Sequence, residues 1–81
     1  MNEATTQCLH QLKVGQSAIV ETPNLDHVRQ RRLAELGIRA GQRIQLLQRS
    51  VGGAVVIDVL DARIAIDRAT AARIRVTEVQ E

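Results

Sequence analysis

The sequence contains no phenylalanine, tyrosine or tryptophan. Grooves that bind proline-rich peptides are walled by aromatic side chains, and single-stranded nucleic acids are bound by stacking bases on aromatic rings. Neither kind of site can be built from this chain. Apolar residues still make up 44% of the sequence, which is ordinary for a folded domain. Any hydrophobic core must therefore consist of valine, isoleucine, leucine and alanine.

Cysteine is also scarce, and long apolar runs are missing. The single cysteine, Cys8, excludes an internal disulfide and is typical of a reducing compartment. No apolar run approaches the ~18 residues that a membrane-spanning helix needs. Residues 1–7 are polar and lack the apolar stretch of a signal peptide. We therefore expect a cytoplasmic protein that is not embedded in a membrane.

The length of 81 residues leaves room for one small core. The chain has no internal repeat, low-complexity tract or linker, so we expect a single domain over residues 1–81, with residues 1–7 frayed. A domain of this size buries only about 60–65% of its unfolded surface. The loss of one large apolar side chain is therefore expected to be costly.

Positive charge is concentrated in one segment. The net charge is +2, but residues 29–49 contain six arginines and one acid, Glu35, for a local net charge of +5. Such a segment can meet an acidic protein surface or phosphates. The alternative is an arginine-rich surface that faces only solvent.

One helix is predicted over residues 25–36. Asn24 is expected to cap it, and Asp26 suits the positive end of the helix dipole in the first turn. Gly37 is expected to end it in the left-handed conformation.

At about 100° per residue, one apolar stripe of this helix contains Leu25, Val28, Leu33 and Leu36. Arg32 falls inside the stripe, because it lies four residues from both Val28 and Leu36. It is either a buried anchor that reaches carbonyl or carboxylate groups, or a side chain at the edge of the stripe that extends to water.

The rest of the chain is predicted to form short strands and turns. The expected strands are residues 17–22, 42–49, 54–60, 63–66 and 74–79. Helical turns are expected at Leu9–Leu12 and over residues 68–72, the second capped by Asp67. Turns are expected at Ser50–Gly53 and at Asp61-Ala62. The side chains expected to point inward are those of Ile44, Leu46, Val55, Ile57, Val59, Ile64 and Ile66. Five strands separated by turns favour a mainly β fold and a small closed barrel over an open sheet with bare edges.

Three motifs, in this order, resemble the FeoA family of ferrous-iron-transport accessory proteins. They are Leu9-x-x-Leu12-x-x-Gly15, then Arg32-Leu33-x-x-Leu36-Gly37-Ile38-x-x-Gly41, and last Ile64-Ala65-Ile66 followed by Ala69 and Ile74-x-Val76. The resemblance implies a five-stranded SH3-like barrel with a helix inserted after the first strand. It also implies a cytosolic protein that contacts and modulates FeoB, the GTP-driven ferrous-iron permease of bacteria. The chain departs from the family at Asp67, where members often carry a basic residue, and in Ser50–Gly53, which lacks a common proline.

Metal binding and catalysis have little support in the sequence. Cys8 and His10 are the only candidate ligand pair, and His27 lies far along the chain. A closed metal site needs three or four protein ligands, so we expect no stoichiometric metal and no cofactor. No Ser/His/Asp arrangement is visible, and no glycine turn precedes the Lys-Ser or Lys-Thr of a phosphate loop. We therefore expect that the protein is not an enzyme.

Partner binding is better supported, because several strands carry apolar residues on both faces. Leu47, Val56 and Leu60 are expected on the outer face, where something must cover them. The cover is either the helix and N-terminal turn of this chain, or another protein, or a second copy. The expected polar rim consists of Arg31, Arg39 and Arg43.

Two alternatives belong to other functional classes. The first is a regulatory domain, since similar barrels end iron-dependent transcriptional repressors; no DNA-binding helix-turn-helix precedes the barrel here, which argues against it. The second is a small nucleic-acid-binding barrel, which rests on the +5 segment alone. Without aromatic residues to stack on bases, we expect no nucleic-acid partner.

Overall fold

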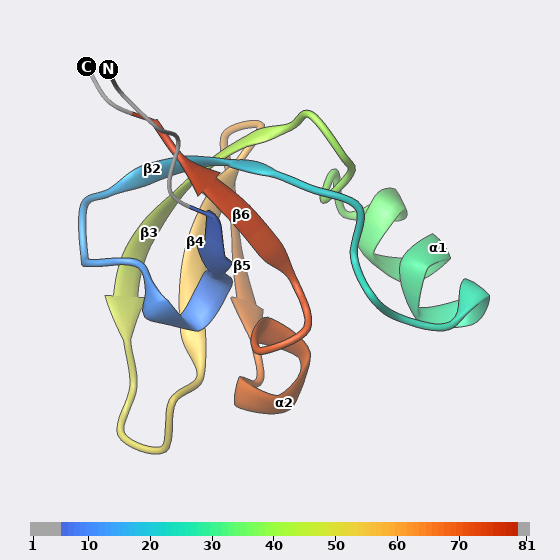
Figure 1. Ribbon diagram of the computed structural model, residues 1–81. Coiled ribbons are helices and arrows are strands. Elements are labelled where there is room, and N and C mark those ends of the chain that lie inside the picture. Colours follow the sequence, from blue (N-terminus) through green and yellow to red (C-terminus); the bar gives the residue numbers. More distant parts are fainter. Residues whose placement is uncertain (1–5, 80–81) are drawn as a thin grey trace.

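The computed structural model describes residues 6–79, in which a curled antiparallel sheet surrounds one core (Figure 1). The order of strands across the sheet is β1-β6-β2-β3-β4-β5. The helix α1 lies beside the barrel, and α2 lies near one end of it (Figure 1). The elements in chain order are β1 (Thr6–Cys8), the 3-10 turn η1 (Leu9–Gln11), β2 (Ser17–Val20), α1 (His27–Glu35), β3 (Arg43–Arg49), β4 (Val55–Val59), β5 (Ala62–Ile66), α2 (Arg68–Ala71) and β6 (Arg75–Glu78). The predicted mainly β fold, with one inserted helix and a second helical turn, is confirmed.

Strand β1 was not predicted, because it falls in a segment expected to be frayed. Thr6 pairs with Thr77 and Cys8 pairs with Arg75, both on β6. The expectation of fraying is therefore wrong for residues 6 and 7, whereas residues 1–5 lie outside the described part of the chain. The run Thr-Gln-Cys has no apolar alternation, so only its pairing with β6 reveals it as a strand. The sheet thus has six strands within residues 6–79, not five.

The two ends of the sheet are β1 and β5, and over residues 6–79 no backbone pairing joins them. The barrel is consequently not closed all the way round, contrary to the expectation. Among the described strands β5 pairs only with β4, so one of its long edges has no neighbouring strand within residues 6–79. This edge faces the side of the molecule on which α1 lies, which makes it relevant to the site described below.

The core is entirely aliphatic. The described residues include no buried polar or charged side chain. The inward positions predicted on the central strands are confirmed, apart from Ile64, which is only half-buried. The predicted helical turn at the start of the chain is also confirmed, since both of its leucines are buried. The buried hydrophobic residues of the core are Leu9, Leu12, Ala18, Val20, Leu33, Ile38, Ile44, Leu46, Val55, Ile57, Val59, Ile66, Ala71, Ile74 and Val76.

The hairpin between β4 and β5 turns one residue earlier than predicted. Leu60 and Asp61 occupy its two corner positions with φ of 50° and 66°, the left-handed conformation that a two-residue hairpin requires. Leu60 therefore lies in a turn and not on the outer face of a strand. The preceding hairpin at Ser50–Gly53 matches the prediction, and Gly52 and Gly53 both have positive φ there.

Helix α1 starts later than predicted, and its cap is Asp26 instead of Asn24. The Oδ1 atom of Asp26 accepts a hydrogen bond of 2.8 Å from the backbone N–H of Arg29, so the residue expected in the first turn satisfies an open donor of the helix. The predicted end of the helix is confirmed, because Gly37 has a φ of +95°. Directly after it, the N–H of Ile38 donates to the carbonyl of Leu33 over 2.8 Å.

The predicted apolar stripe of α1 is wrong as a core-facing surface. Leu33 is buried and Leu25 is partly buried, but Val28 is 69% exposed and Leu36 is 49% exposed. A short helix that lies beside a barrel touches it along a narrow line, which covers one row of side chains at most. Gln30 donates from Nε2 to the carbonyls of Pro23 and Leu25, at 3.0 and 2.7 Å. These bonds fasten the loop before the helix.

Candidate interaction surface

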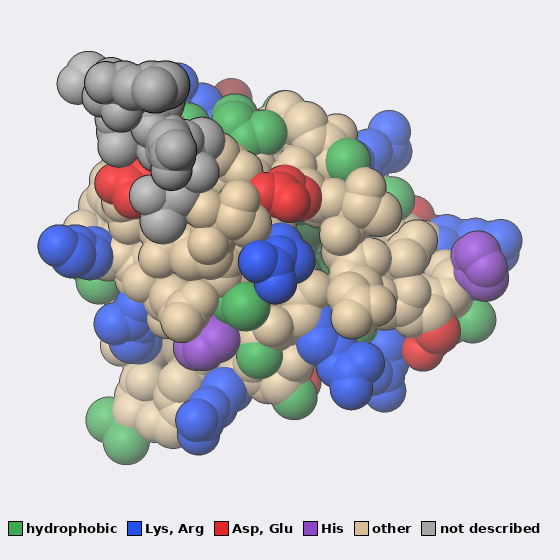
Figure 2. Space-filling view, in the orientation of Figure 1, with side chains coloured by type: hydrophobic (Ala, Val, Ile, Leu, Met, Phe, Trp, Pro, Cys, Tyr) green, Lys and Arg blue, Asp and Glu red, His purple; other side chains and the backbone are tan. Residues whose placement is uncertain are grey.

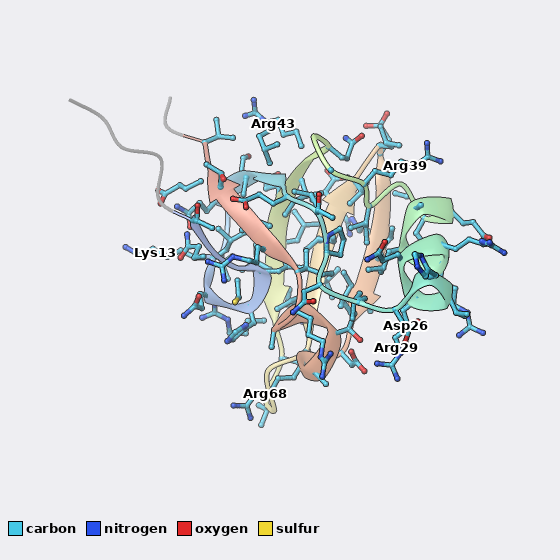
Figure 3. The ribbon with its side chains drawn as sticks, turned by 45° about the vertical axis from the view of Figure 1, so that its right-hand side comes forward. Lys13, Asp26, Arg29, Arg39, Arg43 and Arg68 are labelled. Carbon is cyan, nitrogen blue, oxygen red and sulfur yellow. The ribbon has the colours of Figure 1, made fainter. Side chains whose placement is uncertain are left out.

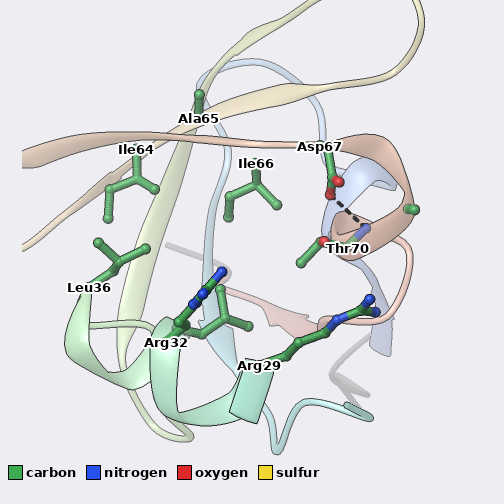
Figure 4. A pocket seen from close by; sticks show the side chains of 10 residues that line it. Arg29, Arg32, Leu36, Ile64, Ala65, Ile66, Asp67 and Thr70 are labelled. Atoms are coloured by element: carbon green, nitrogen blue, oxygen red, sulfur yellow. Dashed lines mark hydrogen bonds between the residues drawn. The ribbon is translucent and has the colours of Figure 1, made fainter. Parts of the chain in front are cut away.

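A groove with a volume of about 410 Å³ separates α1 from β5 and α2 (Figure 4). One wall comes from α1 and its last turn, and the other comes from β5 and the start of α2. The groove is lined by Arg29, Arg32, Leu33 and Leu36 on the first wall and by Ile64, Ala65, Ile66, Asp67, Ala69 and Thr70 on the second. The groove therefore combines apolar and basic side chains.

The floor of the groove is apolar, whereas its rim is basic. Leu33 and Ile66 are 7% and 5% exposed, and the half-buried Ile64 lies beside Ile66 (Figure 4). Figure 4 shows the Arg32 side chain reaching from α1 toward β5, while Arg29 extends toward Thr70. A ligand with an aliphatic side chain and a negative charge would satisfy both parts of this arrangement.

Arg32 is not the buried anchor that was one of its two predicted roles. It is exposed, and its side chain makes no hydrogen bond or ion pair with any residue between 6 and 79. The carbonyl near the end of the helix is instead reached by Arg39, whose Nε donates to Ala34 over 3.1 Å. The charge of Arg32 is therefore available to a partner. Arg29 has only a long contact of 3.8 Å from Nε to Oδ2 of Asp26, which is an exposed pair of little strength.

The α2 end of the groove carries one anion, Asp67. Its Oδ1 accepts a hydrogen bond of 2.9 Å from the N–H of Thr70 and so caps α2 (Figure 4), as predicted. Hydrogen bonds from the side chain and N–H of Thr70 lower the pKa of Asp67, and the positive charge of Arg29 lowers it further. The carboxylate is thus already bound within the chain, whereas on the other wall Arg29 has only its weak pair with Asp26 and Arg32 has no partner among residues 6–79.

A second hollow, of about 270 Å³, adjoins the groove at the end of α1. Its large apolar side chains are Leu36 and Leu60, which are 49% and 68% exposed, and the charged residues that line it are Glu35 and Arg39. Gly37 makes this packing possible, since a Cβ at that position would lie 3.0 Å from Cδ1 of Leu60. Leu36 lines both hollows, so the groove and the Leu36–Leu60 pair form one continuous surface.

The structure brings together some of the residues predicted to bind a partner and separates others. Leu60 lies between the hollow that contains Arg39 and another hollow that contains Arg43. Figure 3 shows Arg39 and Arg43 on the same side of the molecule. Arg31 is exposed on α1 but does not line the groove.

Leu47 and Val56 lie elsewhere. Both are half-buried, and Val56 pairs with Gln48 of β3 and Ala65 of β5 on the outer side of the sheet. The prediction therefore mixed two surfaces, because it placed Leu60 on the same strand face as Val56. Groove residues that the predicted partner-binding set did not include are Arg29, Arg32 and Leu36. A usable signal was present, since Arg29, Arg32 and Leu36 are spaced at three and four residues and must share one side of a helix.

Basic side chains are spread over much of the surface. Figure 2 shows them with few acidic neighbours, and several gather between the positions of α1 and α2. The groove thus opens within a region of positive charge, which favours acidic partners over basic ones.

The candidate metal ligands lie away from this surface. Cys8 is a free, half-buried thiol at the end of β1. Nδ1 of the half-buried His10 has no hydrogen-bond partner among the described residues, and its carbonyl accepts a 2.9 Å hydrogen bond from Nη2 of Arg49. Over residues 6–79 no three His, Cys, Asp or Glu side chains come close enough to hold an ion. The expectation of no tightly bound metal stays a prediction, to be tested below.

Comparison with protein families gives one match, to the FeoA domain, over residues 7–78. No curated protein matches the chain significantly. Among the helices of the described part, none is long and apolar enough to cross a membrane.

Solved structures similar to the chain include FeoA proteins and metal-dependent transcriptional repressors. An iron uptake regulatory protein, FeoA, is 27% identical with a TM-score of 0.86, and the match covers 93% of this chain and all of that one. The zinc complex of FeoA from Stenotrophomonas maltophilia, a procaryotic SH3 domain protein, is 31% identical with a TM-score of 0.73 over 86% and 88% of the two chains. A manganese-dependent transcriptional repressor is 20% identical with a TM-score of 0.82, over 98% of this chain and 45% of the repressor, which shows a shared fold. The predicted SH3-like barrel is confirmed.

Proposed function

Because this chain belongs to the FeoA family, we propose that it is an accessory protein of bacterial ferrous-iron uptake that contacts the cytosolic region of a FeoB-type, GTP-driven permease. In this role it works in the cytoplasm and modulates the permease without catalysing a reaction. The family match over residues 7–78 supports the pathway. The surface of the molecule supports contact with another protein.

The observation that carries the proposal is the exposed pair of Leu36 and Leu60 beside Arg39. These two large aliphatic side chains are 49% and 68% exposed and line the same hollow, so they give a small domain an exposed apolar patch. Such patches, when they have a polar or basic rim, are typical of protein contact sites. Burying the two side chains in a complex would add about 25 cal/mol of binding free energy for each Å² of apolar surface removed from water.

The test is a binding measurement between the purified chain and the purified cytosolic region of the FeoB-type permease from the same genome. Leu60→Asp is the informative variant, because an aspartate tolerates the left-handed conformation of position 60 and leaves the turn intact. We expect it to weaken binding about tenfold or more, equivalent to ~1.4 kcal/mol. Val51→Asp is the matched control, since Val51 is fully exposed at the tip of the other hairpin and should leave binding unchanged.

Absence of binding by the unaltered chain would contradict the proposal. If the unaltered chain binds and Leu60→Asp binds equally well, the contact lies elsewhere. Val56→Asp would then test the outer face of the sheet, where Val56 and Leu47 lie half-buried.

A further inference from the structure

We propose that the groove between α1 and β5 takes an extended, acidic segment of the partner protein, which adds to the sheet as a strand beside β5. This inference rests on the proposed function and names the chemistry of the partner segment. It concerns the edge of β5, a feature that the apolar contact at Leu60 does not use.

The hydrogen-bonding groups of this edge follow from the hairpin. The two-residue turn Leu60-Asp61 makes Val59 and Ala62 a hydrogen-bonded pair. Hydrogen-bonded and non-hydrogen-bonded pairs alternate along an antiparallel ladder, so Ile64 and Ile66 also bond to β4. The intervening residues of β5 are Arg63, between Ala62 and Ile64, and Ala65, between Ile64 and Ile66. Their N–H and C=O groups therefore point away from β4. No described strand lies on that side to receive them.

The groove runs along this edge. Side chains of consecutive residues in a strand point to opposite faces, and Figure 4 shows Ala65 pointing away from Ile64 and Ile66. All three residues nevertheless line the groove. Three consecutive residues can border one hollow only where the hollow meets the backbone edge, so the open groups of Ala65 lie at its side.

The charges around the groove select an acidic segment. Arg29 and Arg32 stand on the opposite wall, and the exposed Arg63 lies on β5 itself. Arg32 has no ion-pair or hydrogen-bond partner among residues 6–79. The single acid of the groove, Asp67, is bound to Thr70. A second copy of this chain would bring its own Arg63 to the same edge, so like charges disfavour pairing of two β5 strands.

The apolar floor completes the recognition. In strand addition, main-chain hydrogen bonds supply affinity and alternate side chains supply specificity. One aliphatic side chain of the incoming segment would pack between Leu36 and the half-buried Ile64. Residues two positions away along the incoming strand share the face of that aliphatic residue, so acidic side chains there would meet the two arginines on α1. The expected segment therefore carries aliphatic and acidic residues at every second position.

The decisive variant is Ala65→Pro. Proline lacks the N–H group, and it is tolerated in edge strands where that group does not bond within the sheet. The ladder to β4 should survive, because the N–H of Ala65 points away from it. We expect binding to the permease cytosolic region to weaken about tenfold or more, whereas Ala65→Val, which keeps the N–H, should bind like the unaltered chain.

The charge is tested separately with Arg32→Glu, for which Arg31→Glu is the control on the same helix but outside the groove. Only Arg32→Glu should weaken binding strongly and reduce its dependence on salt. Amide hydrogen exchange of the unaltered chain tests the same edge without any substitution, so it does not depend on correct folding of the proline variant. In the complex of the unaltered chain, amide exchange at Arg63 and Ala65 should slow markedly relative to the free protein.

The outcomes separate the two proposals. Absence of binding by the unaltered chain contradicts the proposed function and this inference together. Binding that is lost in Leu60→Asp but unaffected by Ala65→Pro and Arg32→Glu, with fast amide exchange at Ala65, overturns this inference and leaves the proposed function in place. Slow exchange that appears on raising the concentration of the free protein would identify a second copy as the occupant, and would also overturn it.

Discussion

Replacing Gly37 with alanine is expected to destabilise the fold more than the same change at a glycine with open surroundings. Gly37 has a φ of +95°, so any residue with a Cβ is strained there. The new methyl group would also lie 3.0 Å from Cδ1 of Leu60 and 3.1 Å from Cγ1 of Val59. Gly15 has a similar φ of +90° with nothing within 4 Å of an added Cβ. It therefore measures the backbone strain alone.

The expected magnitude is the sum of two costs. Backbone strain of an L-residue in the left-handed region costs about 1–2 kcal/mol. Moving Val59 off its preferred position adds about 1 kcal/mol, because Val59 is only 1% exposed and cannot swing away. Leu60 adds little, since it is 68% exposed and free to move. Gly37→Ala should thus cost about 2–3 kcal/mol and Gly15→Ala about 1–2 kcal/mol.

Urea unfolding followed by far-ultraviolet circular dichroism measures both free energies. For a domain of this size, each 1 kcal/mol corresponds to a change of about 4–8 °C in Tm. The same variant should weaken permease binding, because it displaces Leu60 from Leu36. Equal destabilisation by the two substitutions would refute the packing argument, and so would an unchanged position of the Leu60 resonances in Gly37→Ala.

Three further expectations concern the core, the helix cap and metal binding. Leu46→Ala should lower the free energy of unfolding in urea by about 2–5 kcal/mol, because Leu46 is fully buried. Val28→Ala, at an exposed position, should change it by no more than about 0.5 kcal/mol. Similar changes for the two variants would contradict the assignment of the core. Hydrogen bonds lower the pKa of Asp67 in the folded state. The ionised Asp67 side chain therefore stabilises the fold above the ordinary carboxyl pKa, and this stabilisation is lost as the pH falls through the lowered pKa. The gap in stability between the unaltered chain and Asp67→Asn should therefore shrink in acid, and parallel pH profiles would count against this. Elemental analysis of purified protein should find less than one metal ion per chain; a stoichiometric ion that disappears when Cys8 and His10 are replaced would overturn the expectation.

The sequence was sufficient for strands β2 to β6, because apolar residues recur there at every second position. Ile57 and its neighbours on β4 are buried at alternate positions, as the pattern predicted. Glycines at the ends of helices and turns were equally reliable, since few other residues adopt positive φ. Strand β1 was missed because its stability comes from pairing with a strand nearly seventy residues away, which leaves no local signal.

The site was harder to predict, because a helical stripe does not say how much of it is covered. The periodicity placed Leu36 and Val28 in the core, but α1 contacts the barrel only along the row that contains Leu33. The turn was predicted at Asp61-Ala62 but lies at Leu60-Asp61. This shift of one residue moved Leu60 from the outer face of a strand into the turn, and a sequence pattern rarely fixes a turn to within one residue. Both errors hid the same surface, since Leu36 and Leu60 meet there only in three dimensions.

The wholly aliphatic core has a practical consequence for studies of this protein. With no aromatic side chain anywhere in the sequence, the chain has almost no near-ultraviolet absorbance and no intrinsic fluorescence. Any tryptophan emission in a mixture must then come from the partner alone. A permease fragment with a tryptophan near the contact would report association by its own change in emission, without a label on either protein.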